Sequence, residues 1–457
     1  MSVSRQLARF AHDLRYEEIP SEVIAKAKTE LLDTIGICLA SASMPFADGY
    51  VHALTSFDHS ADAAVLGRRE RFSAANAALL NGTFAHGLDF DDTHVASIVH
   101  VSASLLPTAL AVAEWTGRSG QELLAALIVG YEINIRVGLA AAGAFHARGF
   151  HPTALCAMFG CAAVAGRLLG LDEDQLTHAL GLAGSQAGGL QQFLKDGSEV
   201  KRLHAGWAAH AGIMAAVLAQ GGLTGPEHVL EGEFGFYRTH LGTAAPDEGA
   251  LLRELGSTWE TLNISIKPYP CCHFLHAYMD LALDITRQEG LTVEDIAGIE
   301  CMVPETVARL VCEPEEMKKS PKVAYDALFS LPYCVASMLV RGRAALQDFT
   351  VAALGDQQVA ALANLISYRI DTEWSDFPKH FSGWVRLKTH DGRVFEARDR
   401  FNKGCPERPL AAADIASKFM SNATLRLSEA RAQEVLGEIM SLDEKPSLNT
   451  LTRLCIS

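Results

Sequence analysis

Residues 73–102, SAANAALLNGTFAHGLDFDDTHVASIVHVS, indicate both a buried helix and a candidate site. The first half is an alanine-rich apolar run over residues 73–88. It predicts a helix because alanine and leucine favour that conformation. Residues 85–102 then bring together three carboxylates, three imidazoles and three hydroxyls. Polar groups are costly beside apolar packing unless they are hydrogen-bonded. We therefore expect acid–base chemistry where this helix ends.

The composition of the whole chain agrees with a helical protein of two domains. At 457 residues the chain exceeds one ordinary hydrophobic core. Its hydrophobic content is 49% but its aromatic content only 7%, so the apolar side chains are small and suit closely packed helices. The net charge of −15 argues against a nucleic-acid partner. An anionic substrate would then need a local cluster of basic side chains.

The sequence predicts a cytoplasmic protein without a membrane partner. The N-terminus lacks the apolar core of a signal peptide, and apolar stretches such as residues 205–218 are too short to span a bilayer. The ten cysteines form no Cys-x-x-Cys pair, which argues against zinc ribbons and iron–sulfur centres. We interpret them as small buried hydrophobic residues.

Helical patterns fill the chain up to about residue 262. Glycines or prolines mark many of the expected helix ends. The predicted helices are two within residues 4–42, then 73–88, 107–115, 120–136, 152–169, 172–187 and 201–220. From residue 411 onward the chain is helical again.

The pattern changes after Asn263. Residues 299–303, 382–388 and 394–397 predict strands, Asp391-Gly392 predicts a hairpin turn, and residues 325–340 predict a helix. The expected fold class is therefore mainly α. A large all-helical domain comprises residues 1–265 and 404–457, and a smaller α+β domain comprises residues 266–403.

The acidic stretch offers one candidate for acid–base work. Asp89 lies between Leu88 and Phe90, so burial could raise its pKa toward useful values. Asp89, Asp91 and Asp92 together could bind a metal ion, but their spacing matches no known calcium loop. The alternative is a solvated loop at the end of a helix, and we expect no metal.

Further candidates come from polar groups at predicted helix starts and at the domain joint. His100 and His151 precede helices, where a lone histidine is more often a capping or core residue. Lys201 and His204 share one helix face and could form a cationic clamp, although a charged loop is the simpler alternative.

The domain joint supplies the last candidates. Lys267 and Tyr269 lie in a proline-stiffened segment there, which is a common place for a cleft but could be a stiff hinge only. Tyr333, taken alone, is typical of a core aromatic.

Taken in order, these motifs resemble the MmgE/PrpD family from about residue 5 to residue 450. The segments that carry the resemblance are residues 31–36, 85–93, 100, 149–152, 201–206, 267–270 and 329–336. The family contains 2-methylcitrate dehydratases, cis-aconitate decarboxylases and iminodisuccinate epimerases. The resemblance implies a homodimer in which the smaller domain is a lid. It also implies a cleft that binds small di- or tricarboxylates without a metal or organic cofactor.

Matched motif by motif, the resemblance places the active-site residues on Asp89, Thr93, His100, His151, Lys201, Lys267 and Tyr333. The chain departs from the family pattern at three positions. Val101 replaces a usual proline, and His94 replaces the tryptophan of proteobacterial methylcitrate dehydratases. Cys272, with His273 beside it, stands where the decarboxylase branch carries histidine.

These observations predict a cofactor-independent lyase, a dehydratase of a 2-methylcitrate or citrate type of substrate that abstracts a proton beside a carboxylate. The expected catalytic residues are Asp89, His100, His151 and Tyr333. The expected substrate-binding residues are Thr93, Lys201, His204, Lys267 and Tyr269. An epimerase of an iminodisuccinate-like dicarboxylate and a cis-aconitate-type decarboxylase are alternatives within the family. A non-catalytic helical scaffold is the alternative from another class.

Overall fold

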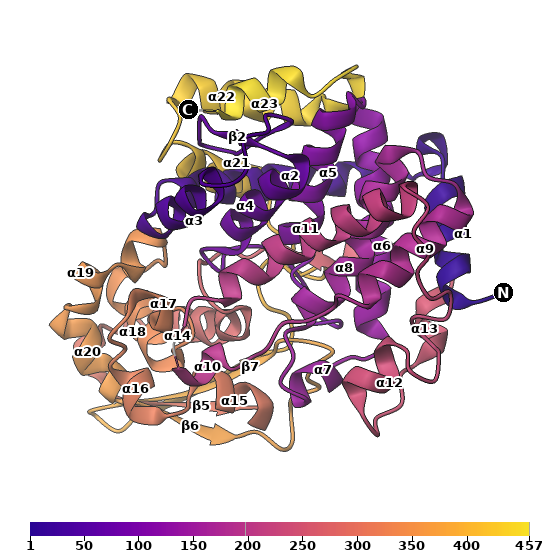
Figure 1. Cartoon of the computed structure of the whole chain (residues 1–457). Helices are drawn as coiled ribbons and strands as arrows, with labels where there is room; N and C mark the ends of the chain where they lie inside the picture. Colours follow the sequence, from indigo (N-terminus) through magenta and orange to yellow (C-terminus); the bar gives the residue numbers. More distant parts are fainter. Residues whose placement is uncertain (197, 457) are drawn as a thin grey trace.

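A computed structural model describes residues 1–196 and 198–456 of the chain. It shows two bodies (Figure 1): a helical body, built from residues 3–265 and 412–455, and a small body, built from residues 273–399. The mainly α fold class predicted from the sequence is confirmed. The limits of the two domains and the action of the smaller one as a lid stay predictions.

The helical body contains most of the helices. Its helices before residue 265 are α1 (Val3–Asp13), α2 (Ser21–Ala42), α3 (Pro45–Thr55), α4 (Ala74–His86), α5 (Ser102–Thr116), α6 (Gly120–Leu139), α7 (Ala144–Ala147), α8 (Pro152–Leu169), α9 (Glu173–Gly184), α10 (Phe193–Asp196), α11 (Lys201–Gln220), α12 (Phe236–Leu241) and α13 (Glu248–Leu252). Short antiparallel pairs join β1 (Ala63–Ala64) to β2 (Arg71–Phe72) and β3 (Thr93–His94) to β4 (Ile264–Ser265).

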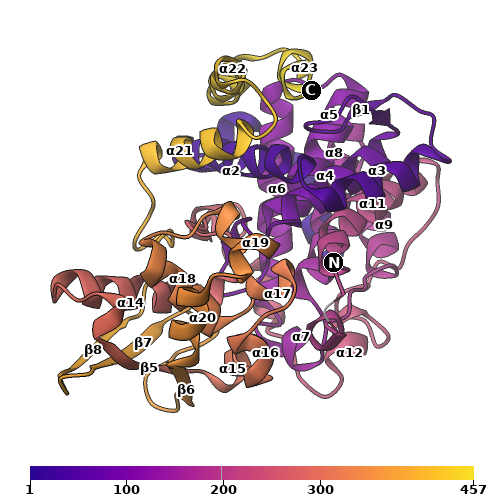
Figure 2. The ribbon, with the colours of Figure 1, turned by 90° about the vertical axis from the view of Figure 1, so that its left-hand side faces the viewer.

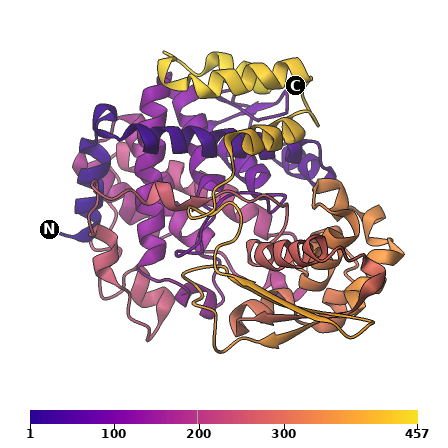
Figure 3. The same ribbon diagram turned by 180° about the vertical axis from the view of Figure 1, so that it is seen from behind.

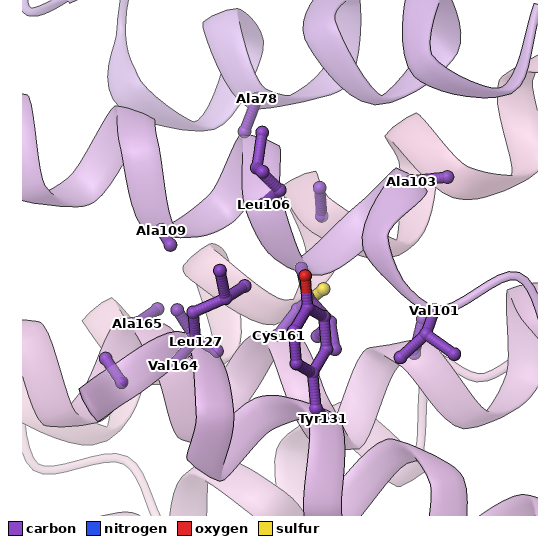
Figure 4. Close-up of a cluster of buried hydrophobic side chains, with 14 of the residues drawn as sticks. Ala78, Val101, Ala103, Leu106, Ala109, Leu127, Tyr131, Cys161, Val164 and Ala165 are labelled. Carbon is purple, nitrogen blue, oxygen red and sulfur yellow. The ribbon is translucent and has the colours of Figure 1, made fainter. Parts of the chain in front are cut away.

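The core of this body forms where α4, α5, α6 and α8 meet. Figure 4 shows Leu106 of α5, Leu127 and Tyr131 of α6 and Val164 of α8 converging beneath Ala78 of α4. The small side chains predicted from the composition let these helices approach closely. The helix α8 has the length and apolar composition of a membrane span, but its residues are almost all buried among neighbouring helices, as in a core helix.

The crossing of α4 and α11 sets the position of the candidate site. At this crossing Gly82 faces Gly206, and a Cβ atom added to Gly82 would lie 2.7 Å from the Cα atom of Gly206. Only glycine allows so close an approach of two helix backbones. The contact brings the end of α4 beside Lys201, the first residue of α11.

The helix α2 contains a buried acid, Glu30, whose Oε1 atom lies 2.5 Å from the Nζ atom of Lys26. Burial raises the pKa of Glu30 to about 8, against the opposing effect of Lys26. A carboxyl whose pKa is raised on folding stabilises the fold most below its unfolded pKa near 4. That contribution is lost as the pH rises through 8.

We expect E30Q to flatten the dependence of the unfolding free energy on pH between 5 and 8. One proton corresponds to a slope of about 1.4 kcal/mol per pH unit, which sets the maximum change. Urea unfolding at pH 5, 6.5 and 8 measures it. The control, E22Q, changes an exposed glutamate of the same helix and should keep the wild-type slope. Equal slopes for E30Q and the wild type would contradict the raised pKa.

The small body is an α+β unit around a mixed sheet. The strand order is β6 (Ile366–Ile370), β5 (Ile296–Val303), β7 (Gly383–Thr389) and β8 (Val394–Asp399), with β5 and β6 parallel and the other pairs antiparallel. Its helices are α14 (His276–Gln288), α15 (Glu305–Val311), α16 (Glu315–Lys319), α17 (Ala324–Ala327), α18 (Leu331–Arg341), α19 (Val351–Leu354) and α20 (Gln357–Asn364). Figure 3 shows the sheet at the outer edge of this body, with α14 against its inner face.

After β8 the chain runs back to the helical body. The helices α21 (Ala412–Ala423), α22 (Glu429–Met440) and α23 (Asn449–Cys455) complete the chain. Figure 2 shows α21 lying beside α2, and the two helices are in direct contact. A segment far along the sequence therefore supports the helix that begins near residue 21.

Two predicted helices and one strand that was not predicted differ from the sequence-based expectation. The helix predicted to begin at Pro107 begins at Ser102, because the side chain of Asp92 accepts hydrogen bonds from the first backbone N–H groups. The helix predicted over residues 325–340 is interrupted between α17 and α18, where Ser330 caps a new start before Pro332. The strand β6, which no alternation pattern predicted, completes one edge of the sheet.

Candidate active site

Two backbone contacts deliver the site residues to one place. The pairing of Thr93 with Ser265 in β3 and β4 runs antiparallel, so the acidic loop before Thr93 lies beside Lys267, two residues beyond Ser265. The crossing of α4 and α11 adds Lys201 from the other side. Groups far apart in the sequence thus meet at the end of α4.

Asp89 joins the two lysines. Its Oδ1 atom lies 2.5 Å from Nζ of Lys201 and 3.3 Å from Nζ of Lys267, and Lys267 also donates to the Asp89 carbonyl at 2.8 Å. All three side chains are buried. The sequence suggested that burial would raise the pKa of Asp89. Instead the two ammonium groups outweigh burial and lower its pKa, so Asp89 stays ionised.

The balance of charge in this trio favours an anionic ligand. Two ammonium groups share one carboxylate, which leaves one positive charge without a partner inside the trio. The Oδ2 atom of Asp89 has no hydrogen-bond partner among the described residues. Asp89 is also held at a φ of 50°, a left-handed conformation that costs energy outside glycine. Strain of this kind is typical of functional sites.

Asp91 supports two imidazoles. Its Oδ2 atom lies 2.7 Å from Nδ1 of His86 and 3.3 Å from Nδ1 of His100. The Nδ1 atom of His100 also lies 2.9 Å from the carbonyl oxygen of Asp92. The Asp91 carboxylate and the Asp92 carbonyl can only accept, and the Thr93 hydroxyl, 3.5 Å from the same nitrogen, can accept as well, so Nδ1 carries a proton and donates. In this tautomer Nε2 of His100 is available to exchange a proton with a substrate. A carboxylate that orients an imidazole in this way is typical of a histidine that acts as a general base.

Asp92 has a structural task. It accepts hydrogen bonds from the backbone N–H groups of Val101 and Ser102 and from the Ser102 hydroxyl, which also contacts Tyr131. These bonds satisfy the first N–H groups of α5. The three aspartates therefore have different roles: Asp89 binds the lysines, Asp91 orients the histidines, and Asp92 caps a helix.

One group of side chains could hold a metal ion by proximity alone. A single ligand atom from each of His86, Asp91 and His100 lies within 4.8 Å of the others. Direct hydrogen bonds already account for this closeness, since both Nδ1 atoms face the same Asp91 oxygen. We therefore interpret the group as two imidazoles hydrogen-bonded to one carboxylate.

A second pair of histidines lies across the site. The Nδ1 atoms of His151 and His204 are 3.0 Å apart, so one ring donates to the other. Burial lowers the pKa of both, for His204 to about 4, and each is held neutral at pH 7. His151 stands immediately before α8, and its ring centre lies 6.3 Å from that of His100.

A cavity between the two bodies collects most of these groups. Most of its polar side chains come from the helical body, but Lys267 comes from the segment between the bodies and His273 from the small body. Its apolar side chains come from both bodies. The lining residues are Asp89, Thr93, Ile98, His100, His146, His151, Gln191, Phe193, Leu194, Lys201, Lys267, Cys272, His273, Phe274, Leu310, Phe329 and Phe381. Ile98, at a φ of 55°, inserts from the helical body into the hydrophobic cluster of the small body.

The structure brings together six of the predicted site residues. Asp89, Thr93, His100, His151, Lys201 and Lys267 all line the cavity. His204 does not line the cavity, but it is hydrogen-bonded to His151, which does.

Two predicted tyrosines lie elsewhere. The hydroxyl of Tyr269 donates to Asp280 at 2.5 Å, and that of Tyr333 donates to the carbonyl oxygen of Asp348 at 2.7 Å. Both hydroxyls are bound within the small body, so in this structure neither faces the reacting groups. The predicted catalytic role of Tyr333 and the binding role of Tyr269 are not supported by this geometry.

Several residues of the site were not predicted from the sequence. Asp91 and His86 lay in the quoted stretch, but no local pattern distinguishes Asp91 from Asp89 as the partner of histidine. The side chains of His146, in α7, and Gln191, in the turn before α10, are hydrogen-bonded to each other, and neither residue belongs to a motif. His273 was noticed only as a neighbour of Cys272.

The fold and the cavity define a class: mainly helical proteins with a buried acid–base site against a smaller α+β body. Comparison of the sequence with models of known protein families identifies one family. The MmgE/PrpD N-terminal domain model matches residues 5–248, and the C-terminal domain model matches residues 269–443. The chain belongs to the MmgE/PrpD family, which confirms the resemblance.

The chain is similar over its full length to characterised enzymes of two reaction classes. It is 28% identical to a cis-aconitate decarboxylase of Aspergillus terreus, covering 99% of this chain and 95% of that protein. It is 26% identical to human cis-aconitate decarboxylase, covering 99% and 94%. It is 25% identical to a 2-methylcitrate dehydratase of Cupriavidus necator, covering 94% and 91%.

Proposed function

We propose that this protein is a cofactor-independent lyase that acts on a small tricarboxylate by moving a proton at a carbon beside a carboxylate. One observation carries the proposal: Lys201 and Lys267 share Asp89 next to His100, whose proton on Nδ1 is fixed by two acceptors. The lysines would hold substrate carboxylates and stabilise the charge that develops on them. His100 would exchange the proton through Nε2.

Two lyase reactions share this step. In dehydration, His100 takes a proton from carbon and a hydroxyl leaves with a proton as water. In decarboxylation of a cis-aconitate type of acid, the bond from CH₂ to its carboxylate breaks and CO₂ leaves. The electron pair forms a new double bond to the central carbon, and the former double-bond CH carbon takes a proton from the His100 imidazolium. Both require a fixed substrate pose.

Two observations favour the decarboxylation. Dehydration needs an acid for the leaving hydroxyl, and Tyr333, one of the expected catalytic residues, instead donates to the carbonyl oxygen of Asp348 outside the cavity. The cavity also has a wall of aromatic side chains, Phe193, Phe274, Phe329 and Phe381. An apolar wall solvates neutral CO₂ better than a carboxylate and so favours its release. The full-length similarity to cis-aconitate decarboxylases agrees with this preference.

We extend the proposal to the assembly and its compartment. The small body would act as a lid, because its side chains close one side of the cavity. A cytoplasmic location suits the ten buried cysteines, which are all free thiols. The homodimer implied by the family resemblance completes the proposal, and sedimentation of the purified protein would test it.

Incubating the protein in D₂O with cis-aconitate, 2-methylcitrate, citrate and iminodisuccinate, followed by NMR, tests the reaction. We expect cis-aconitate to lose CO₂ and to gain one deuteron at the former double-bond CH carbon. Water loss from 2-methylcitrate or citrate would instead establish the dehydratase. Deuterium exchange without loss of either would establish an epimerase. Inactivity toward all four acids would contradict the proposed function and favour the scaffold.

A further inference from the structure

We infer that His273 is a substrate-binding residue, a neutral hydrogen-bond donor for a substrate carboxylate oxygen, and that Asn402 is the positioning residue that fixes its tautomer. His273 lies at the start of the short helix η3 (His273–Leu275) and lines the cavity that also contains Lys201 and Lys267. Asn402 belongs to the segment that leads from β8 back to the helical body. The substrate class rests on the proposed function, but the hydrogen-bonding argument does not.

The orientation of the Asn402 amide follows from its contacts. Its Nδ2 atom lies 3.2 Å from the carbonyl oxygen of Lys403, which can only accept, so this atom is the amide nitrogen. The same nitrogen lies 2.7 Å from Nε2 of His273. The amide therefore donates to Nε2, and Nε2 must carry the lone pair. In a neutral ring the proton then resides on Nδ1.

The charge of His273 is set by its surroundings. Burial, the ring of His276 and the ammonium group of Lys267 all lower the pKa of His273, so the ring is neutral at pH 7. With a neutral ring and an occupied Nε2, the Nδ1–H group is the only donor that the side chain can offer.

Among the residues that the structure describes, this donor has no partner. The Nδ1 atom of His273 is buried and forms no hydrogen bond within the described part of the chain, and the residue is only 4% exposed. Buried N–H groups are nearly always satisfied in folded proteins, since an unsatisfied one destabilises the fold. The nearby rings are His276, with centres 4.8 Å apart, and Phe381 at 5.4 Å. A ligand oxygen in the cavity would supply the missing acceptor.

A tricarboxylate is the class of ligand that needs such a group. The lysine pair neutralises part of its charge, and a third carboxylate needs donors that do not add a further buried cation. A neutral imidazole N–H meets that need. A ligand without a carboxylate at that position would leave the N–H group unpaired and would bind more weakly. His273 would therefore contribute to substrate specificity.

The tautomer and the ligand contact can be observed directly. In protein labelled with ¹⁵N-histidine, we expect the His273 signals of the free protein to show a protonated Nδ1 and an unprotonated Nε2. The assignment uses the loss of these signals in H273N. Titration with tricarballylate, a saturated tricarboxylate that neither loses water nor decarboxylates, should move the Nδ1 proton downfield. If tricarballylate leaves the chemical shift of the Nδ1 proton unchanged, the inference is overturned, and a buried water is then the acceptor for this N–H group.

Variants supply a second, independent measurement. H273L removes the donor, whereas H273N places an amide N–H near the position of Nδ1. N402D replaces the donor to Nε2 with an acceptor, which draws the ring proton to Nε2 and leaves an acceptor facing the ligand. We expect H273L and N402D to weaken tricarballylate binding at least tenfold by calorimetry, and H273N to stay within about threefold of the wild type. N364D, the same change on the exposed face of α20, should bind as the wild type does.

The outcomes separate this inference from the proposed function. Equal affinity in H273L and the wild type overturns the role of His273, even if the protein turns over cis-aconitate. Loss of affinity in H273L and N402D, in a protein that converts none of the four acids, supports the binding role and rejects the reaction. A wild-type protein that binds no tricarboxylate overturns both. Circular dichroism of each variant shows whether weaker binding reflects loss of fold.

Discussion

H100N is expected to lower kcat by about 10²–10⁴-fold, the usual contribution of a general acid–base residue. The asparagine amide keeps an N–H group near Nδ1, so the contacts to Asp91 and the Asp92 carbonyl survive. What it lacks is Nε2, the nitrogen that would exchange the proton. The loss should therefore appear in kcat rather than in KM, measured by NMR with the acid that the wild type converts.

Two comparisons decide whether the effect belongs to His100. H151N tests a second histidine of the cavity. It should lower kcat less than H100N does, because the Nδ1 atom of His151 is hydrogen-bonded to His204. H178N is the matched control, since Nδ1 of His178 bonds a backbone carbonyl, that of Gly225, away from the cavity. It should leave kcat unchanged. Retention of wild-type kcat in H100N together with its loss in H151N would identify His151 as the base instead.

The helices of the chain were predictable because their signals are local. The helices α8 and α11 have the predicted bounds, where Pro152 begins one and Gly221 follows the other. The start of α5 was not predictable, because its cap is Asp92, ten residues upstream and beyond a reversal of the chain. Likewise β6 depends on parallel pairing with β5 rather than on its own alternation.

The site was predictable as a set of residues but not as a set of contacts. The density of polar groups around Asp89 and the family motifs together indicated the lysines and the histidines. The direction of the Asp89 pKa was wrong, because the local neighbours Leu88 and Phe90 predict desolvation while the decisive ammonium groups come from residues 201 and 267. Electrostatic partners of this kind depend on tertiary structure and leave no trace in adjacent residues.

Lys418 shows how a remote residue can position the site. Its ammonium group in α21 pairs with Asp33 of α2 at 2.7 Å. It also donates to the carbonyl oxygens of Phe90 at 3.0 Å and Lys267 at 2.9 Å, and it lies 3.8 Å from the centre of the Phe90 ring. One buried cation thus ties together the loop that carries Asp89 and the segment that carries Lys267.

We therefore expect K418M to lose both stability and activity. Removing the cation leaves Asp33 buried without its partner, which should lower the free energy of unfolding by about 3–5 kcal/mol in urea titrations. It also frees the two backbone segments, and a displacement of about 1 Å at the reacting groups can lower the rate about 100-fold. K445M, which removes a lysine paired with Glu438 near the surface, should change neither quantity appreciably.

The double variant D33N/K418M separates the two effects of Lys418. Neutralising Asp33 removes the unpaired buried charge, so most of the lost stability should return. The carbonyl oxygens of Phe90 and Lys267 still lack their common donor, so kcat should stay as low as in K418M. If activity returns together with stability, the charge pair alone matters and the positioning role is wrong. If K418M keeps wild-type kcat while losing stability, Lys418 stabilises the fold without organising the site.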